Sequence, residues 1–171
     1  IHQHFMLVPS LTVAENVALG LPSSRGPLTD LERVSERIVE LGNIYGLHID
    51  PAAPVWQLSV GQQQRVEILK ALYRGADLLI LDEPTAVLTP QEVDELFITL
   101  RQMKQEGHAL IFISHKLHEV VNISDRVTVL RDGRVVNSLN TMDATKESLA
   151  EMMVGREIVM QLERPVVKRG E

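Results

Sequence analysis

The sequence predicts an α/β protein with a mostly parallel sheet core and a smaller helical part. Two short apolar runs, residues 77–82 and 109–114, flank a segment whose apolar residues recur at helical spacing, as in a β-α-β unit. The apolar residues are mostly Leu, Val and Ile, which suits parallel strands buried beneath helices. A length of 171 residues is enough for one well-buried domain.

Three helices are expected within residues 10–75, because the spacing of a capping box occurs three times there. In a capping box, side chains and backbone amides at the helix start form reciprocal hydrogen bonds. The spacing occurs at Thr12 with Glu15, Thr29 with Glu32, and Ser59 with Gln62. Glycines 20 and 75 are placed to end the first and third helices. The second should reach about residue 45, along the apolar stripe Leu31, Val34, Ile38 and Leu41, and residues 21–27 should form a loop.

Residues 76–156 are expected to hold the sheet. After strand 77–82, Thr89-Pro90-Gln91-Glu92 supplies a cap, a first-turn proline and a capping acid for a helix to residue 106. Its apolar face would be Val93, Leu96, Phe97, Leu100 and Met103. The next elements in order would be the buried strand 109–114, a helix at 117–122, a hairpin of strands 126–131 and 134–138 at a sheet edge, a helix at 146–154, and a linker at 157–171.

The composition excludes several classes of ligand and of chemistry. Lys and Arg total 17 against 23 Asp and Glu, a formal net charge of −6, so nucleic acid and anionic lipid are not expected as direct ligands. The absence of cysteine excludes disulfides and thiol catalysis. The apolar runs are far shorter than the roughly 18–20 residues that span a bilayer.

Reactive side chains follow both predicted parallel strands. Asp82 and Glu83 end the first strand and His115 follows the second, so parallel pairing should bring all three to one rim of the sheet. That set suits phosphoryl transfer, with Asp82 holding Mg²⁺, Glu83 polarising a water and His115 donating to the γ-phosphate. The alternative is that Asp82-Glu83-Pro84 is only a polar turn closing a strand.

The segment from Ser59 predicts an anion site at a helix start. The first amides of a helix have no intrahelical acceptor, Ser59 adds a hydroxyl, and Gly61 would let the backbone approach a phosphate closely. The alternative is an ordinary capped helix. The flanking residues 62–65 and the later Asp82-Glu83 favour the anion site.

In order along the chain, residues 58–65, 78–84 and 113–115 resemble the signature, Walker B and switch-histidine motifs of ABC-type ATPases. The resemblance implies that Ser59, Val60, Gly61 and Gln62 bind ATP in the site of the opposite subunit, and that Glu83 and His115 are catalytic. Gln3 is similar to the glutamine of the family's Q-loop, which contacts Mg²⁺ together with Asp82 and couples the site to the membrane partner. The implied cofactors are ATP and Mg²⁺.

The resemblance covers residues 1–156 as a partial ATPase domain, with residues 10–75 as a helical subdomain and 76–156 as the sheet core. No glycine-rich loop ending in Gly-Lys-Ser/Thr occurs in the 171 residues, so we expect an N-terminally truncated fragment that is inactive when isolated. Four segments, residues 2–9, 86–90, 114–116 and 152–157, resemble those of the uptake subgroup that serves simple sugars and nucleosides. Subunits of this subgroup carry two fused ATPase halves, and the resemblance places this chain in the first half.

The function so implied is hydrolysis of ATP on the cytoplasmic face of the cell membrane to drive import of a small solute. The implied partners are permease subunits, a second ATPase half and, indirectly, a solute-binding protein. The sequence departs from the family pattern at Thr89, where the family's D-loop usually has an aspartate. This difference puts communication between the two ATP sites in question.

Two alternatives remain open: a soluble ABC-type ATPase acting on ribosomes or nucleic acid, and an inert truncated module. His2 and His4 lack the further ligands that a metal site needs, and His108 and His118 are expected at the surface.

Overall fold

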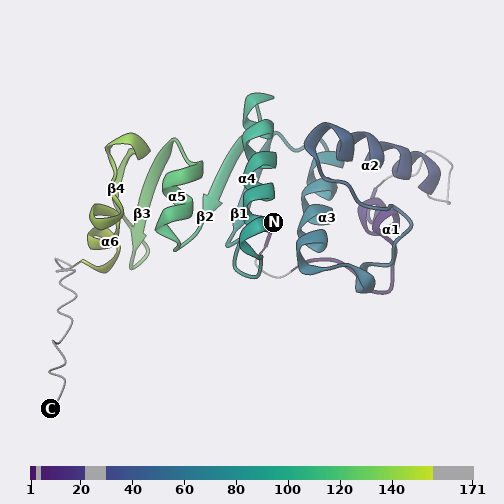
Figure 1. Cartoon of the computed structure of the whole chain (residues 1–171), viewed down its shortest axis with the longest axis horizontal. Helices are drawn as coiled ribbons and strands as arrows, with labels where there is room; N and C mark the ends of the chain where they lie inside the picture. Colours follow the sequence, from purple (N-terminus) through teal and green to yellow (C-terminus); the bar gives the residue numbers. More distant parts are fainter. Residues whose placement is uncertain (3–4, 22–29, 156–171) are drawn as a thin grey trace, which may run out of the picture. The chain divides into compact units, whose positions relative to one another are not determined.

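A computed structural model describes residues 1–2, 5–21 and 30–155 (Figure 1). Contacts divide the chain after His115 into two compact units. No helix among the described residues has both the length and the apolar character needed to cross a membrane.

Three helices of the first unit pack against one another: α1 (Val13–Ala18), α2 (Leu31–Tyr45) and α3 (Val60–Tyr73). A short 3₁₀ turn, η1 (Val55–Gln57), precedes α3. Their shared core is apolar, with Val17, Ile38 and Ile68 each at most 1% exposed. Asn16 is buried among them. Its side-chain oxygen accepts from the Val8 amide at 2.7 Å, and its side-chain nitrogen donates to the Thr12 carbonyl at 2.9 Å. The three predicted helices are therefore confirmed.

The predicted caps are confirmed at Thr12, Ser59 and Thr89, where each side chain accepts from the third helical amide in a complete capping box. The start predicted for α2 is wrong by one residue. Asp30 is the cap, because its carboxylate accepts from the Arg33 amide at 3.3 Å. Thr29 and the loop predicted from residue 22 onward lie outside the described residues.

The sheet of the first unit contains β1 (Leu78–Asp82) and β2 (Ala109–Ile113), which pair in parallel with Asp82 opposite Ile113. Helix α4 (Pro90–Gln105) connects them and packs on one face, where the rings of Phe97 and Phe112 meet edge to face with centroids 5.9 Å apart. Ile1 adds backbone bonds to β1, from its amine to the Ile80 carbonyl at 2.8 Å and from the Asp82 amide to its own carbonyl at 3.1 Å. The predicted β-α-β unit is confirmed.

The prediction that both strands are buried is wrong for one of their faces. Successive side chains of a strand point to opposite sides, and α4 covers the side that carries Leu79 and Leu81, which are 2% and 0% exposed. The other side remains open to solvent. Its apolar residues are between 47% and 50% exposed: Leu78, Ile80, Ile111 and Ile113.

The second unit consists of α5 (Leu117–Ile123), the antiparallel strands β3 (Arg126–Arg131) and β4 (Arg134–Asn140), a 3₁₀ turn η2 (Thr141–Asp143) and α6 (Lys146–Val154). Its core forms around Val127, Val129 and Leu149. The hairpin was predicted to lie at a sheet edge, and within the described residues β3 and β4 form a two-stranded sheet of their own. Apolar residues of α5 and α6 pack against this core.

Candidate functional site

The ends of β1 and β2 bring two of the three predicted reactive residues of this rim, Glu83 and His115, into contact. Asp82 is the last residue of β1, and Glu83 follows it with φ of 47°, in the left-handed region that side chains rarely adopt. The Glu83 amide donates to the Ile113 carbonyl at 2.9 Å, which joins the first residue beyond β1 to the end of β2. The predicted juxtaposition of Glu83 with His115 is therefore confirmed.

The Glu83 carboxylate is fixed through one of its two oxygens. Oε1 accepts from the His115 amide at 3.1 Å and from the His115 ring nitrogen Nδ1 at 2.8 Å. Oε2 is buried and has no hydrogen-bond partner within the described parts of the chain. A buried carboxylate oxygen without a donor is costly unless something binds it. This oxygen is thus the group at the rim best suited to accept a hydrogen bond from a water or to face a cation.

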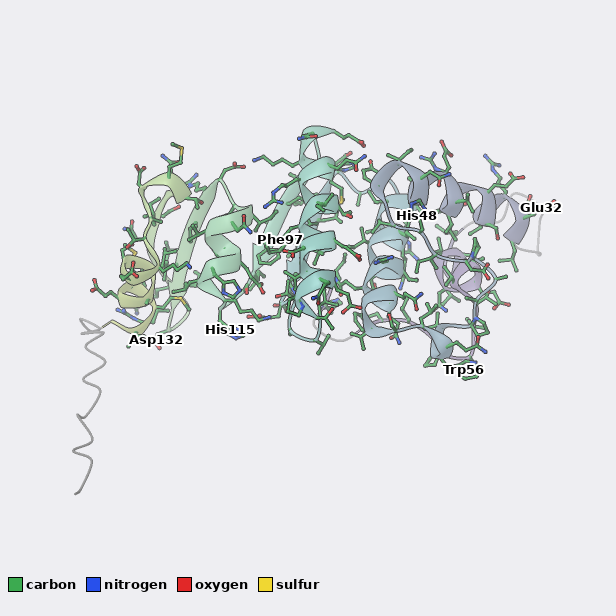
Figure 2. All side chains as sticks on the ribbon, in the orientation of Figure 1. Glu32, His48, Trp56, Phe97, His115 and Asp132 are labelled. Carbon is green, nitrogen blue, oxygen red and sulfur yellow. The ribbon has the colours of Figure 1, made fainter. Side chains whose placement is uncertain are left out.

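The contact with Glu83 also determines which nitrogen of the neutral His115 ring carries the proton. Because Nδ1 donates to the carboxylate, the other nitrogen, Nε2, carries a proton only when the ring is the imidazolium. The His115 side chain is 70% exposed (Figure 2). The ring can therefore donate to an external anion only in its charged form.

The signature segment lies at the start of α3, as predicted. Ser59 Oγ accepts from the Gln62 amide at 3.2 Å and Gln62 Oε1 accepts from the Ser59 amide at 2.9 Å, so both side chains serve as caps. The amides of Val60 and Gly61 precede the first bond of the helix, from the Gln63 amide to the Ser59 carbonyl at 2.9 Å. Ser59 and Val60 are exposed, whereas Gly61 is buried.

The segment that follows the predicted Q-loop glutamine is held by residues that sequence reasoning missed. Gln3 itself lies outside the described residues. Glu67, which is 7% exposed on α3, accepts from the Met6 amide at 2.7 Å, and Lys70 donates to the Met6 carbonyl at 2.9 Å. The only signal for this clamp in the sequence is an acid at a buried helix position.

A second missed contact joins the end of α2 to the turn after α4. Tyr45 Oη lies 3.2 Å from His108 Nε2, while His108 Nδ1 lies 3.0 Å from the Ala76 carbonyl oxygen. Burial, with a further contribution from Glu106, raises the pKa of Tyr45 to about 12. The surface position expected for His108 is wrong, because it is half-buried in these contacts, whereas His118 is exposed.

A metal ion needs a cluster of ligand side chains. The described residues contain no group of three or more His, Cys, Asp or Glu side chains that could hold an ion. The assignment of Asp82 and Gln3 to Mg²⁺ stays a prediction.

The fold matches ATP-binding cassettes. One match is the dimeric structure of an ATP-binding cassette in a post-hydrolysis state bound to ADP and Pi, with a TM-score of 0.65 and 28% identity, over 81% of this chain and 60% of that chain. A nucleotide-free ATP-binding cassette from an ABC transporter matches with a TM-score of 0.69 and 23% identity, over 82% of this chain and 60% of that chain. The expected fold class is thereby confirmed.

The family profile described as ABC transporter matches residues 1–86, and the chain belongs to this family. It is 51% identical to the glucose import ATP-binding protein TsgD13 of Haloferax volcanii, over 100% of this chain and 36% of the relative. It is 50% identical to the nucleoside import ATP-binding protein NupA of Lactococcus lactis, over 92% of this chain and 31% of the relative. It is 46% identical to the guanosine import ATP-binding protein NupO of Bacillus subtilis, over 99% of this chain and 33% of the relative. The chain thus spans about a third of the length of these relatives.

Proposed function

We propose that this chain is part of an ATP-hydrolysing subunit that energises the import of a small solute through a membrane permease. The observation that carries the proposal is the rim formed by Glu83 and His115, in a chain whose relatives are named import ATP-binding proteins. Residues 10–75 would act as a helical subdomain that carries the signature, residues 76–156 as the core, and residues 157–171 as a linker.

The geometry of the rim supports a role for each of its residues. Glu83 Oε2 is buried without a donor and would accept a proton of the attacking water, while Oε1 stays bonded to His115. The imidazolium form of His115 would donate from Nε2 to the transferred phosphoryl group. Asp82, which is half-buried at the end of β1, fits Mg²⁺ as a carboxylate oxygen ligand, with Gln3 as the second proposed ligand. Bound Mg²⁺ would supply charge neutralisation on the phosphates.

The signature would bind the triphosphate of the opposite ATPase half. The exposed hydroxyl of Ser59 and the amides of Val60 and Gly61 form the positive end of α3, and Gln62 fixes that turn through the Ser59 amide. This arrangement requires a second ATPase half or subunit as partner. ATP is therefore the proposed nucleotide.

The relatives also support the solute class and the place of action. Glucose, nucleoside and guanosine appear in their names, so a simple sugar or a nucleoside is the proposed solute. The subunit would act at the cytoplasmic face of the membrane with permease subunits, and a solute-binding protein would deliver the solute to them.

The test is uptake of radiolabelled glucose, ribose and guanosine by cells that express the complete polypeptide with its permease. Uptake of one solute class should disappear with Glu83→Gln while the amounts of both proteins stay unchanged. Gln91→Ala, at an exposed position on α4, is the matched control. Equal uptake in cells with and without the polypeptide, for every sugar and nucleoside tried, would contradict the proposal.

A further inference from the structure

Glu92 of α4 occupies the place where a side chain on Gly61 would lie. A methyl group built on Gly61 would lie 2.6 Å from Cδ and 3.1 Å from Cγ of Glu92, and in closer contact still with Oε1. Carbon atoms that are not bonded do not approach so closely, so one of the two residues would have to move. Gly61 is accordingly buried, although it lies in the first turn of α3.

The Glu92 carboxylate is not free to move aside. Its Oε2 accepts from the Thr89 amide and from the Thr89 hydroxyl, both at 2.9 Å, and the Thr89 hydroxyl accepts in return from the Glu92 amide at 3.4 Å. These bonds form the capping box of α4. Displacing the carboxylate would therefore break the two bonds that it accepts in the capping box of α4. In accord with these bonds, the pKa of Glu92 is lowered, mainly by the Thr89 amide.

The contact continues along the same two helices. Arg65, one turn further along α3, forms an ion pair with Glu95, which lies three residues after Glu92 on α4. The α4 cap is in turn tied to Glu83 through successive turns, from the Ala86 amide to the Glu83 carbonyl at 3.1 Å and from the Leu88 amide to the Thr85 carbonyl at 3.4 Å. A short path thus runs from the signature turn through Glu92 and Thr89 to Glu83.

We propose that Glu92 is a positioning residue, which holds the signature turn at Ser59–Gln62 against the segment that follows Glu83. Gly61 is glycine because the Glu92 carboxylate fills its side-chain position, in addition to any contact that it makes with phosphate. The effect on turnover rests on the proposed ATPase function. The packing of Glu92 on Gly61 does not depend on it.

The experiment is a double-mutant cycle in the complete polypeptide with Gly61→Ala, Glu92→Ala and both together. ATP turnover, KM and the melting temperature without nucleotide are measured for each. Gly61→Ala should lower turnover about tenfold in the unmodified background and have little further effect once Glu92→Ala has removed the carboxylate. Glu92→Gln is the matched variant of equal size, and it should not relieve Gly61→Ala.

Glu92→Ala alone should reduce kcat severalfold with KM for ATP little changed, whereas Glu92→Gln, which keeps an oxygen for Thr89, should stay within about twofold of the unmodified protein. Gln91→Ala, on the same turn of α4, provides the control for nonspecific effects. The positioning role is overturned if Glu92→Ala turns over ATP as fast as Gln91→Ala.

The reason given for the glycine is overturned if Gly61→Ala causes the same loss of turnover and of melting temperature in both Glu92 backgrounds. Failure of the proposed function has a different signature. Turnover would then be insensitive to Glu83→Gln, while the melting temperatures would still show the coupling between positions 61 and 92.

Discussion

At the scale of single residues, Glu83 combines an unfavourable backbone conformation with several compensating contacts. Its φ of 47° costs a side-chain-bearing residue about 1–2 kcal/mol. The bonds from its amide to the Ile113 carbonyl and from His115 to its carboxylate offset this cost. Because glutamine has nearly the same size and retains an acceptor oxygen, Glu83→Gln changes the charge at this position while disturbing the geometry little.

Tyr45 provides a prediction for alkaline pH. Its folded-state pKa of about 12 lies above the ordinary value of 10.0, so the folded state holds the phenolic proton more tightly than the unfolded state. The resulting stabilisation is complete below pH 10.0 and is lost as pH rises toward about 12, by at most about 1.4 kcal/mol per pH unit. Urea unfolding at a series of pH values should show this loss in the unmodified chain.

Tyr45→Phe removes the titrating group and keeps the ring, so it is the control for that experiment. The difference in unfolding free energy between the two proteins should shrink between pH 10.0 and about 12. A difference that stays constant over this interval would show that the Tyr45 phenol has the same pKa in the folded and unfolded states.

At the scale of secondary-structure elements, α3 organises the first unit. Its first turn carries the signature, Arg65 pairs with Glu95 of α4, and Glu67 with Lys70 holds the backbone of Met6. A shift of α3 would therefore move the segment after Gln3 and the signature turn together. The single helix α3 thus connects two parts of the proposed ATPase site, the signature turn and the segment that follows Gln3.

Glu67 tests that arrangement. Glu67→Ala leaves the Met6 amide without its acceptor and should lower the unfolding free energy by about 1–3 kcal/mol, measured by urea denaturation. Glu67→Gln keeps an oxygen acceptor of the same reach and should lose clearly less. Equal losses in the two variants would show that the bond to Met6 contributes nothing to stability.

The β3–β4 turn makes a separate prediction in the second unit. Gly133 has φ of 72°, and no atom lies within 4 Å of an added Cβ, so Gly133→Ala introduces backbone strain without a clash. It should lower the unfolding free energy by about 1 kcal/mol in urea denaturation. Asp132→Asn, at the neighbouring residue with φ of 50°, should cause almost no change, because asparagine tolerates this conformation. Equal stability of Gly133→Ala and the unmodified chain would contradict this account of the turn.

The elements were largely predictable from sequence because their signals are local. The capping boxes at Thr12, Ser59 and Thr89 use residues three apart, and the structure confirms all three. The start of α2 was placed one residue early because Thr29 with Glu32 has the spacing of a capping box. The actual cap, Asp30, is followed three residues later by Arg33 and uses only its own carboxylate, which the capping-box spacing does not detect.

Contacts between distant segments were not predictable in the same way. Parallel pairing predicted that Glu83 and His115 would share a rim, because the carboxyl ends of parallel strands meet. The contact of Gly61 with Glu92 joins residues whose local patterns each had a sufficient local explanation, a signature glycine and a capping acid. Only the packing of α3 against α4 reveals that they meet.

At the scale of the whole molecule, the open face of the β1–β2 sheet is an apolar surface on the 171-residue chain. Leu78, Ile80, Ile111 and Ile113 lie on it, each about half exposed. Contiguous apolar surface of this kind promotes association. The purified chain is therefore expected to self-associate through this face.

The prediction is that Ile80→Thr combined with Ile111→Thr reduces light scattering of the 171-residue chain at equal concentration, with little loss of folded structure. The matched control is Leu79→Thr with Leu81→Thr on the covered face of β1. These two side chains are 2% and 0% exposed, so replacing them should lower the unfolding free energy by several kcal/mol. Unchanged scattering in the first pair would show that another surface drives association.

The most direct measurement of the central claim is ATP hydrolysis by the complete polypeptide with its partners, with Glu83→Gln and His115→Ala beside the unmodified sequence. The account predicts that Glu83→Gln retains ATP binding and lowers kcat by about a hundredfold or more, with a large loss also for His115→Ala. Undiminished hydrolysis in both variants would contradict the assignment of the β1–β2 rim as the site of ATP hydrolysis.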